Sequence, residues 1–168
     1  MLAFVHAGHS PTFIDPSWAN YPDGMVLRQL GASQMSQSAI LMLNGMTFGG
    51  VFHRHPKLRV ASIENGSDWL HLLVKRLRKL ANQTPSSFHE DPLDTVRQHV
   101  WVTPYLEDDL RALADLIGVE RILFGSDWPH GEGVAQPLDF AKELSMFGEG
   151  DQRRIMRENV LELLGGLG

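Results

Sequence analysis

Cysteine is absent from the sequence, so the chain has no disulfide framework, no thiolate zinc site and no cysteine nucleophile. Any metal ion that it binds must be held by histidine, aspartate and glutamate. Nucleotide-binding and serine-hydrolase signatures are also lacking: there is no G-x-G-x-x-G, no Walker loop and no G-x-S-x-G. A nucleotide-dependent or serine-hydrolase mechanism therefore has no support in the sequence.

Positive charge is scarce, with 15 lysine and arginine residues against 20 aspartate and glutamate residues. A surface that follows nucleic-acid phosphates needs the reverse balance, so we expect no nucleic-acid partner. Long apolar runs are lacking too: Met1–Val5 is too short for a signal-peptide core or a membrane span, and no basic segment precedes it. We therefore expect a cytoplasmic protein with no membrane partner.

The 168 residues do contain enough apolar side chains, 43% of the chain, for the core of a single domain. Short apolar runs predict four strands, at 2–7, 58–63, 99–102 and 121–124. Helical spacing of apolar residues predicts helices over 25–52, 69–80, 106–117, 137–146 and 151–164. The polar stretch 82–97, with two prolines, reads as a loop that holds at most one helical turn.

Strands and helices alternate along the chain, and the strands are apolar throughout. This order predicts an α/β fold with a parallel sheet covered by helices, and both a doubly wound sheet and a TIM barrel fit it. Four β/α units average roughly 40 residues each, whereas a full eight-unit barrel needs about 250 residues. A barrel would thus be present as one half, and a strand at the first residues suggests a segment of a longer chain.

Polar side chains follow each predicted strand, at the end where parallel sheets carry their functional groups. These residues are His6, Glu64, Thr103 and Asp127. A histidine, a glutamate and an aspartate from different strand ends suit a hard or borderline divalent cation. The pair His53 and His55 is different, because it precedes a strand and should lie at the opposite face of the sheet.

The most specific segment is Gly-Ser-Asp-Trp-Pro-His at 125–130, followed by Ile-Met-Arg-Glu-Asn-Val-Leu-Glu-Leu-Leu-Gly at 155–165. Upstream stand Gly-Gly-Val-Phe at 49–52 and His-Pro-Lys-Leu-Arg-Val at 55–60. With these segments the chain resembles the amidohydrolase-2 family, the amidohydrolase-related TIM barrels that include aminocarboxymuconate-semialdehyde decarboxylase and aromatic-acid decarboxylases. The resemblance implies that residues 1–168 form one partial amidohydrolase-like domain, the C-terminal half (strands five to eight) of a (β/α)8 TIM barrel.

The resemblance also implies a site with one divalent metal, usually zinc. His6 matches the strand-five ligand and Asp127 the strand-eight aspartate, which is also the expected catalytic acid/base. Glu64 stands where the family has its strand-six histidine, so the expected metal ligands are His6, Glu64 and Asp127. The family's strand-one His-x-His pair has no counterpart in this chain. The nearby loop residues that we expect to contact substrate are His9, Trp128 and His130.

Two functional hypotheses follow. In the first, the chain is the C-terminal part of a metal-dependent enzyme, a hydrolase or non-oxidative decarboxylase of a small carboxylated or cyclic molecule. In the second, it is a truncated, non-catalytic half-barrel or a subunit that needs a partner, either a missing N-terminal half or another copy of itself. A doubly wound domain without a metal site is the third and weakest reading.

Overall fold

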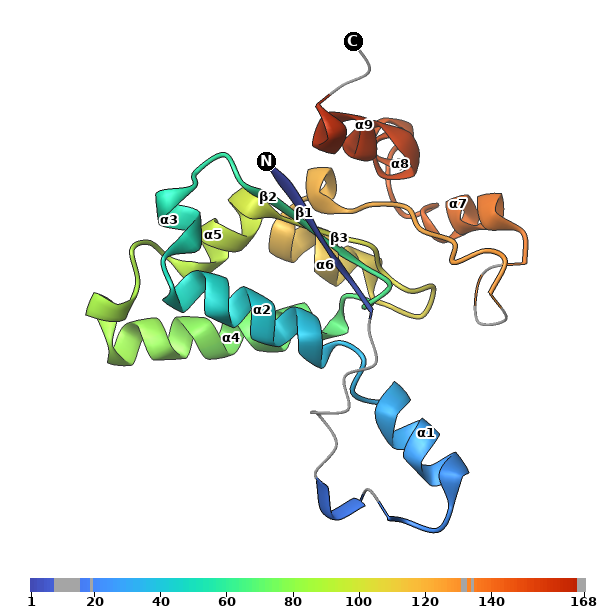
Figure 1. The fold of residues 1–168 in the computed structure, drawn as a ribbon. Coiled ribbons are helices and arrows are strands. Elements are labelled where there is room, and N and C mark those ends of the chain that lie inside the picture. Colours follow the sequence, from blue (N-terminus) through green and yellow to red (C-terminus); the bar gives the residue numbers. More distant parts are fainter. Residues whose placement is uncertain (8–15, 19, 131–132, 134, 166–168) are drawn as a thin grey trace.

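Three parallel strands form the sheet at the centre of the computed structural model, which describes residues 1–168 except 8–15, 19, 131–132, 134 and 166–168. The strands are β1 (Leu2–His6), β2 (Arg59–Ile63) and β3 (Val100–Val102), in the order β1-β2-β3 (Figure 1). A mixed α/β fold with a parallel sheet is therefore confirmed.

The fourth predicted strand, at 121–124, is wrong as a full strand. Val119–Arg121 forms a 3-10 turn, η4, and Ile122 then makes a single parallel bridge with Val102. Beyond that bridge the Phe124 amide donates to the Ile155 carbonyl oxygen at 3.2 Å. The backbone thus leaves β3 after one bridge and turns toward the C-terminal helices.

The predicted helix over 25–52 is divided into three. These pieces are α1 (Gly24–Ala32), α2 (Gln37–Phe48) and α3 (Val51–Arg54). Turns at 33–36 separate the first two, and Gly50, with a φ of 63°, separates the last two. Glycine accepts this left-handed conformation without steric penalty. Short 3-10 turns also occur at Pro16–Trp18 (η2) and Pro85–Ser87 (η3).

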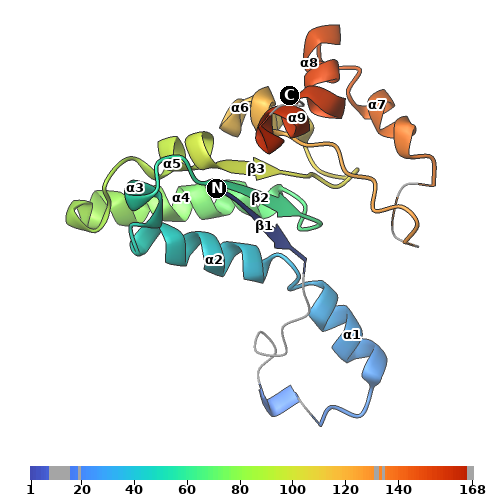
Figure 2. The same ribbon diagram turned by 45° about the horizontal axis from the view of Figure 1, so that its top comes forward.

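Three further helices follow along the chain and pack with α2 against the sheet (Figure 2). They are α4 (Asp68–Gln83), α5 (Pro92–His99) and α6 (Leu110–Ile117). The loop predicted over 82–97 is wrong in its second half, where α5 lies. Its start carries a standard N-terminal signal: the Asp91 carboxylate accepts from the Leu93 amide at 2.8 Å, and proline occupies the first turn.

The C-terminal segment is helical, as expected, but broken. It comprises η5 (Pro137–Asp139), α7 (Phe140–Glu143), α8 (Glu149–Arg153), the π-helical turn η6 (Arg154–Glu158) and α9 (Asn159–Leu164). The side-chain Nδ2 of the buried Asn159 donates to the carbonyl oxygens of Val119 and Ile122, at 2.8 and 2.7 Å. This side chain ties the helical segment to the turn and bridge that follow α6.

The core is split by the sheet. The larger cluster joins the strands to α2, α4, α5 and α6 and also includes Phe140 and Ile155 of the C-terminal segment. Leu70, Leu113 and Ile117 are among its fully buried members. A smaller cluster on the other face consists of Ala61, Trp101, Leu123 and Leu163. Within the described residues, no helix has the length and apolar character that a membrane crossing requires.

Glycine 118 ends α6, as the sequence predicts, with φ 88° and ψ 148°. Since side chains other than glycine are strained there, we expect Gly118→Ala to lower the free energy of unfolding by about 1–3 kcal/mol. Gly148→Ala is the matched control, because Gly148 has φ −65° and open space around it. Urea unfolding of both variants checks the prediction, and equal midpoints would contradict it.

Candidate metal centre

The polar residues at the strand ends lie together at one edge of the sheet. His6 is the last residue of β1, Glu64 follows β2, and Asp127 follows the bridge at Ile122. Glu64 and Asp127 both have left-handed backbones, with φ of 57° and 53°. Such conformations are uncommon for residues other than glycine and concentrate at functional sites.

Three side chains form a compact group of possible metal ligands. One ligand atom each from Glu64, Asp127 and His130 lies within 4.8 Å of the other two. Within the group, Asp127 Oδ1 lies 2.9 Å from His130 Nδ1. His130, expected from the sequence to contact substrate, is thus also placed where it can bind a cation.

His6 contacts this group through Glu64. Its Nδ1 lies 2.8 Å from the Ala7 carbonyl oxygen, and its Nε2 lies 3.0 Å from Oε2 of Glu64. A carbonyl oxygen only accepts hydrogen bonds, so Nδ1 carries a proton. Nε2 is therefore the His6 nitrogen that faces the Glu64 carboxyl group and could bind a cation.

Burial raises the pKa of the Glu64 carboxyl group. The hydrogen bond between this carboxyl group and Asp127 raises the pKa further, as does the charge of Asp127, while His6 and His130 act in the opposite direction. Burial likewise raises the pKa of Tyr105, and the charges of Glu64 and Asp108 add to the effect. The phenol of Tyr105 therefore stays protonated at neutral pH.

The donor set fits a divalent metal ion. Two carboxylates and an imidazole nitrogen are ligands that zinc binds at about 2.0–2.2 Å, and carboxylates also suit manganese. Glu64 and Asp127 bring two carboxyl groups close together, and the repulsion between their negative charges helps to raise the pKa of Glu64. A cation bound to both groups relieves the same repulsion.

The remaining residues expected at the site differ in where the structure places them. His9 lies outside the described residues. Trp128 stands beside Asp127 with 65% of its surface exposed, so it is free to contact a bound molecule. Thr103 and Tyr105 both form hydrogen bonds with the backbone of Glu64. The sequence identifies Thr103 as a residue at a strand end but indicates no role for it, and it does not identify Tyr105. A tyrosine three residues beyond a strand end is the signal that could have drawn attention to it.

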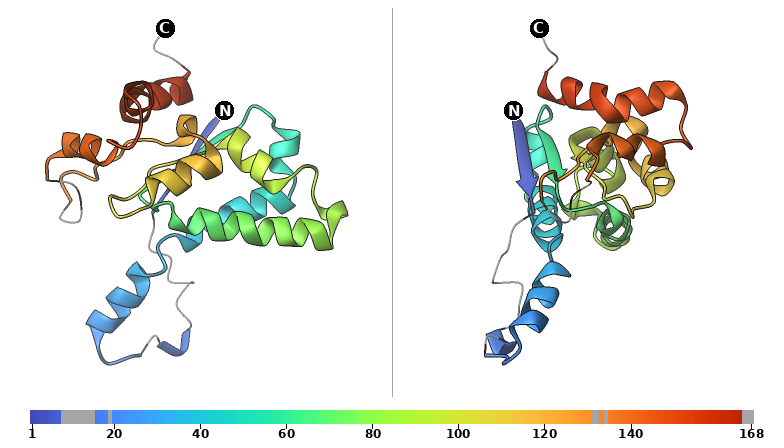
Figure 3. Two further views of the ribbon diagram at one scale, coloured as in Figure 1. Left: turned by 180° about the vertical axis from the view of Figure 1, so that it is seen from behind. Right: turned by 90° about the vertical axis from the view of Figure 1, so that its right-hand side faces the viewer.

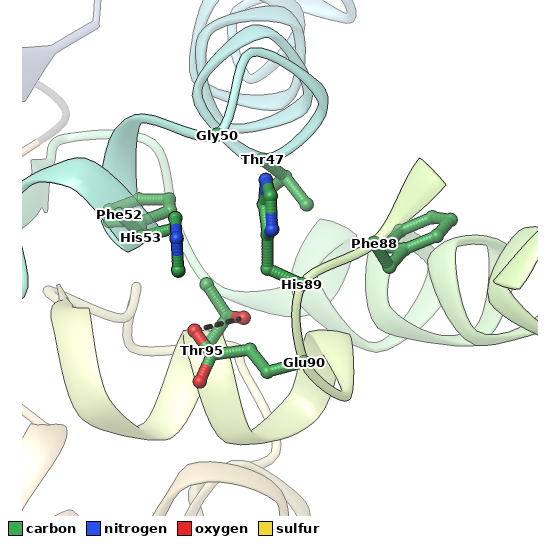
Figure 4. A pocket seen from close by; sticks show the side chains of 8 residues that line it. All are labelled: Thr47, Gly50, Phe52, His53, Phe88, His89, Glu90 and Thr95. Carbon is green, nitrogen blue, oxygen red and sulfur yellow. Dashed lines mark hydrogen bonds between the residues drawn. The ribbon is translucent and has the colours of Figure 1, made fainter. Parts of the chain in front are cut away.

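The pair His53 and His55 does not join the site. His53 lies in α3, which precedes β2, and its ring stacks on His89 with centroids 4.1 Å apart (Figure 4). Gly50 and Glu90 help to line the small pocket beside these rings. These contacts pack the segment before α5 against α3.

The fold and the site together define a class, mixed α/β proteins that gather carboxylate and imidazole side chains at the strand ends of a parallel sheet. A protein-family model described as amidohydrolase narrows this class, because it matches residues 3–166. The chain belongs to the amidohydrolase family, as the 125–130 motif implied. A decarboxylase of 2-amino-3-carboxymuconate-6-semialdehyde from Dictyostelium discoideum is 26% identical over 136 residues, which cover 78% of this chain and 38% of that protein.

Solved structures support the same fold. An amidohydrolase from Mycobacterium avium subsp. paratuberculosis K-10 is 47% identical, with a TM-score of 0.88 over 99% of this chain and 42% of that one. A 2,6-dihydroxybenzoate decarboxylase from Rhizobium gives a TM-score of 0.72 at 18% identity, over 98% of this chain and 51% of that one. A dihydroxybenzoic acid decarboxylase from Polaromonas, solved with bound manganese, gives 0.70 at 18% identity, over 96% and 49%. The chain spans about half or less of each of these relatives.

Proposed function

We propose that this chain is the C-terminal part of a metal-dependent amidohydrolase-family enzyme, a hydrolase or non-oxidative decarboxylase of a small carboxylated or cyclic molecule. The observation that carries the proposal is the convergence of Glu64, Asp127 and His130 at the carboxyl edge of the sheet. In this proposal residues 1–168 form one partial domain that corresponds to strands five to eight of a (β/α)8 barrel. The decarboxylases among its relatives support the choice of chemistry.

Glu64 and Asp127 are the proposed carboxylate ligands, and His6 and His130 are the imidazoles beside them. Zinc is the ion that we propose, and the manganese in the Polaromonas structure makes manganese a practical probe. When bound, such an ion supplies a Lewis acid that polarises a carboxylate or carbonyl group of the substrate.

Asp127 is the proposed catalytic acid/base, exchanging a proton with the substrate at a carboxylate oxygen. His130 Nδ1 lies 2.9 Å from Oδ1 of Asp127, so its imidazole orients this carboxyl group through one hydrogen bond. Trp128 flanks the aspartate on the same loop, and we propose that it and His130, together with His9, contact the substrate.

Titration of the chain with Mn²⁺, followed by electron paramagnetic resonance, tests the proposal. We expect one stoichiometric site, displaced by Zn²⁺. Glu64→Gln should weaken Mn²⁺ binding by about tenfold or more, since supporting groups outside the ligand set already account for about 10–100-fold. Gln preserves the size of the side chain, so the left-handed backbone is no more strained than in the wild type.

Glu143→Gln provides the matched control, because Glu143 is an exposed glutamate at the end of α7. We expect it to bind Mn²⁺ as the wild type does. A wild-type chain without a stoichiometric site, or equal losses in the two variants, would contradict the proposal for this chain.

The alternative is a half-barrel that acts only with a partner, and one observation favours it. β1 is the end strand of the sheet, runs along one margin of the molecule (Figure 3, right) and carries Phe4 with 58% of its surface exposed. An apolar side chain on an end strand invites pairing. Light scattering after size-exclusion chromatography separates the readings: a chain that is monomeric at all concentrations excludes pairing with its own copies.

A further inference from the structure

The backbone of Glu64 is held by two hydroxyl groups from the segment that follows β3. The Glu64 amide donates to Oγ1 of Thr103 at 3.2 Å, and the phenol of Tyr105 donates to the Glu64 carbonyl oxygen at 2.6 Å. The backbone amide and the backbone carbonyl of Glu64 are therefore both hydrogen-bonded to side chains. In a sheet, neighbouring strands satisfy such groups, but Glu64 has already left β2.

The same segment is fastened to the turn after Glu64. Oδ2 of Asp108 accepts from the Ser67 amide at 2.7 Å, from the Ser67 hydroxyl at 2.8 Å and from the Tyr105 amide at 2.9 Å. Gly66 lies under the Tyr105 ring so closely that a Cβ there would stand 2.6 Å from a ring carbon. Tyr105 is thus fixed at both ends, by its amide and by its ring.

Thr103 lies close both to β2 and to the segment that leads to Asp127. Its hydroxyl donates to the Ser62 carbonyl oxygen at 3.2 Å, and a Cβ built on Gly125 would lie 3.3 Å from the Thr103 methyl carbon. Gly125 stands two residues before Asp127. One buried threonine therefore contacts the backbones that carry both carboxylates of the site.

We propose that Thr103 and Tyr105 are positioning residues, which hold Glu64 in its left-handed conformation and so direct its carboxylate toward Asp127 and His6. The inference rests on the proposed metal site and deepens it. A residue with φ near 57° returns to a relaxed backbone once its hydrogen bonds are removed, because the left-handed region is disfavoured for residues with a Cβ. The carboxylate then turns away from its partners.

Three variants separate the contributions of these side chains. Thr103→Val removes the hydroxyl and keeps the shape, Thr103→Ser keeps the hydroxyl, and Tyr105→Phe removes the phenolic oxygen alone. Tyr21→Phe is the matched control, because Tyr21 is the other tyrosine of the sequence and its ring lies beside Trp18.

We expect Thr103→Val and Tyr105→Phe each to weaken Mn²⁺ binding by about tenfold, while Thr103→Ser and Tyr21→Phe bind as the wild type does. In the metal-free chain, hydrogen exchange of the Glu64 amide should be up to about tenfold faster in Thr103→Val and unchanged in Thr103→Ser, as expected for one lost hydrogen bond. The carbonyl ¹³C shift of Glu64 should move in Tyr105→Phe and stay in Tyr21→Phe.

Wild-type Mn²⁺ affinity in both Thr103→Val and Tyr105→Phe would overturn the inference. So would an unchanged Glu64 amide in the first variant together with an unchanged Glu64 carbonyl in the second. If the wild-type chain itself binds no Mn²⁺, the proposed metal function of this chain fails, and the exchange and shift measurements alone then decide whether the two hydroxyls position Glu64.

Discussion

Asp127→Asn should lower the affinity for Mn²⁺ by at least about 100-fold, above the range of supporting residues, while the protein stays folded. Asp127 is bonded to His130 and lies against Glu64, so its charge is central to the group. Asparagine is the appropriate replacement, because aspartate and asparagine both tolerate a φ near 53° and the test then isolates charge from backbone strain.

The control for this prediction is Asp139→Asn. Asp139 forms a surface ion pair with Lys142 at 2.9 Å, remote from the strand ends in sequence. Exposed pairs of this kind contribute at most about 1 kcal/mol to stability, so neither folding nor metal binding should change noticeably. Equal Mn²⁺ affinity of Asp127→Asn and Asp139→Asn would remove Asp127 from the proposed site.

The largest effect on stability is expected at Phe140. Its ring is fully buried and lies 5.4 Å, centroid to centroid, from the ring of Phe124. Phe140→Ala leaves a cavity and should lower the free energy of unfolding by about 3–5 kcal/mol, a large part of the 5–15 kcal/mol typical of a domain. Urea unfolding measures the loss.

Leu138→Ala is the matched control for Phe140→Ala, because Leu138 lies two residues earlier with 76% of its surface exposed. Its removal should change stability by less than about 0.5 kcal/mol. Because Phe124 is three residues before Asp127, Phe140→Ala should also weaken Mn²⁺ binding. A similar small loss in both variants would show that α7 does not contribute to the core.

The sequence predicted those parts of the fold that depend on local chemistry. Continuous apolar runs located β1, β2 and β3, Gly118 located the end of α6, and polar residues after strands located Glu64 and Asp127. The prediction was wrong where a contact distant in sequence decides the outcome. Residues 121–124 are apolar enough for a strand, but hydrogen bonds to the C-terminal helical segment replace further pairing with β3.

Composition also gave no indication of α5 or of the contact between Tyr105 and Glu64. Two prolines in 82–97 indicated a loop, yet Pro92 occupies the first turn of a helix, where its missing amide proton is not needed. Tyr105 gave no periodic or motif signal, because its role depends on the left-handed turn at Glu64, 41 residues away. Periodicity does not reveal which backbone groups a side chain will satisfy.

The two edges of the sheet differ in how the hydrogen bonds of their backbone groups are made. At the bridge formed by Ile122, the groups that point away from β3 are the Ile122 carbonyl and the Phe124 amide, and they bond to Asn159 and to the Ile155 carbonyl. The π-helical turn and α9 thus serve as a surrogate for the next strand. A further strand, if one paired with this sheet, would therefore be expected at the opposite edge, which β1 and the exposed Phe4 form.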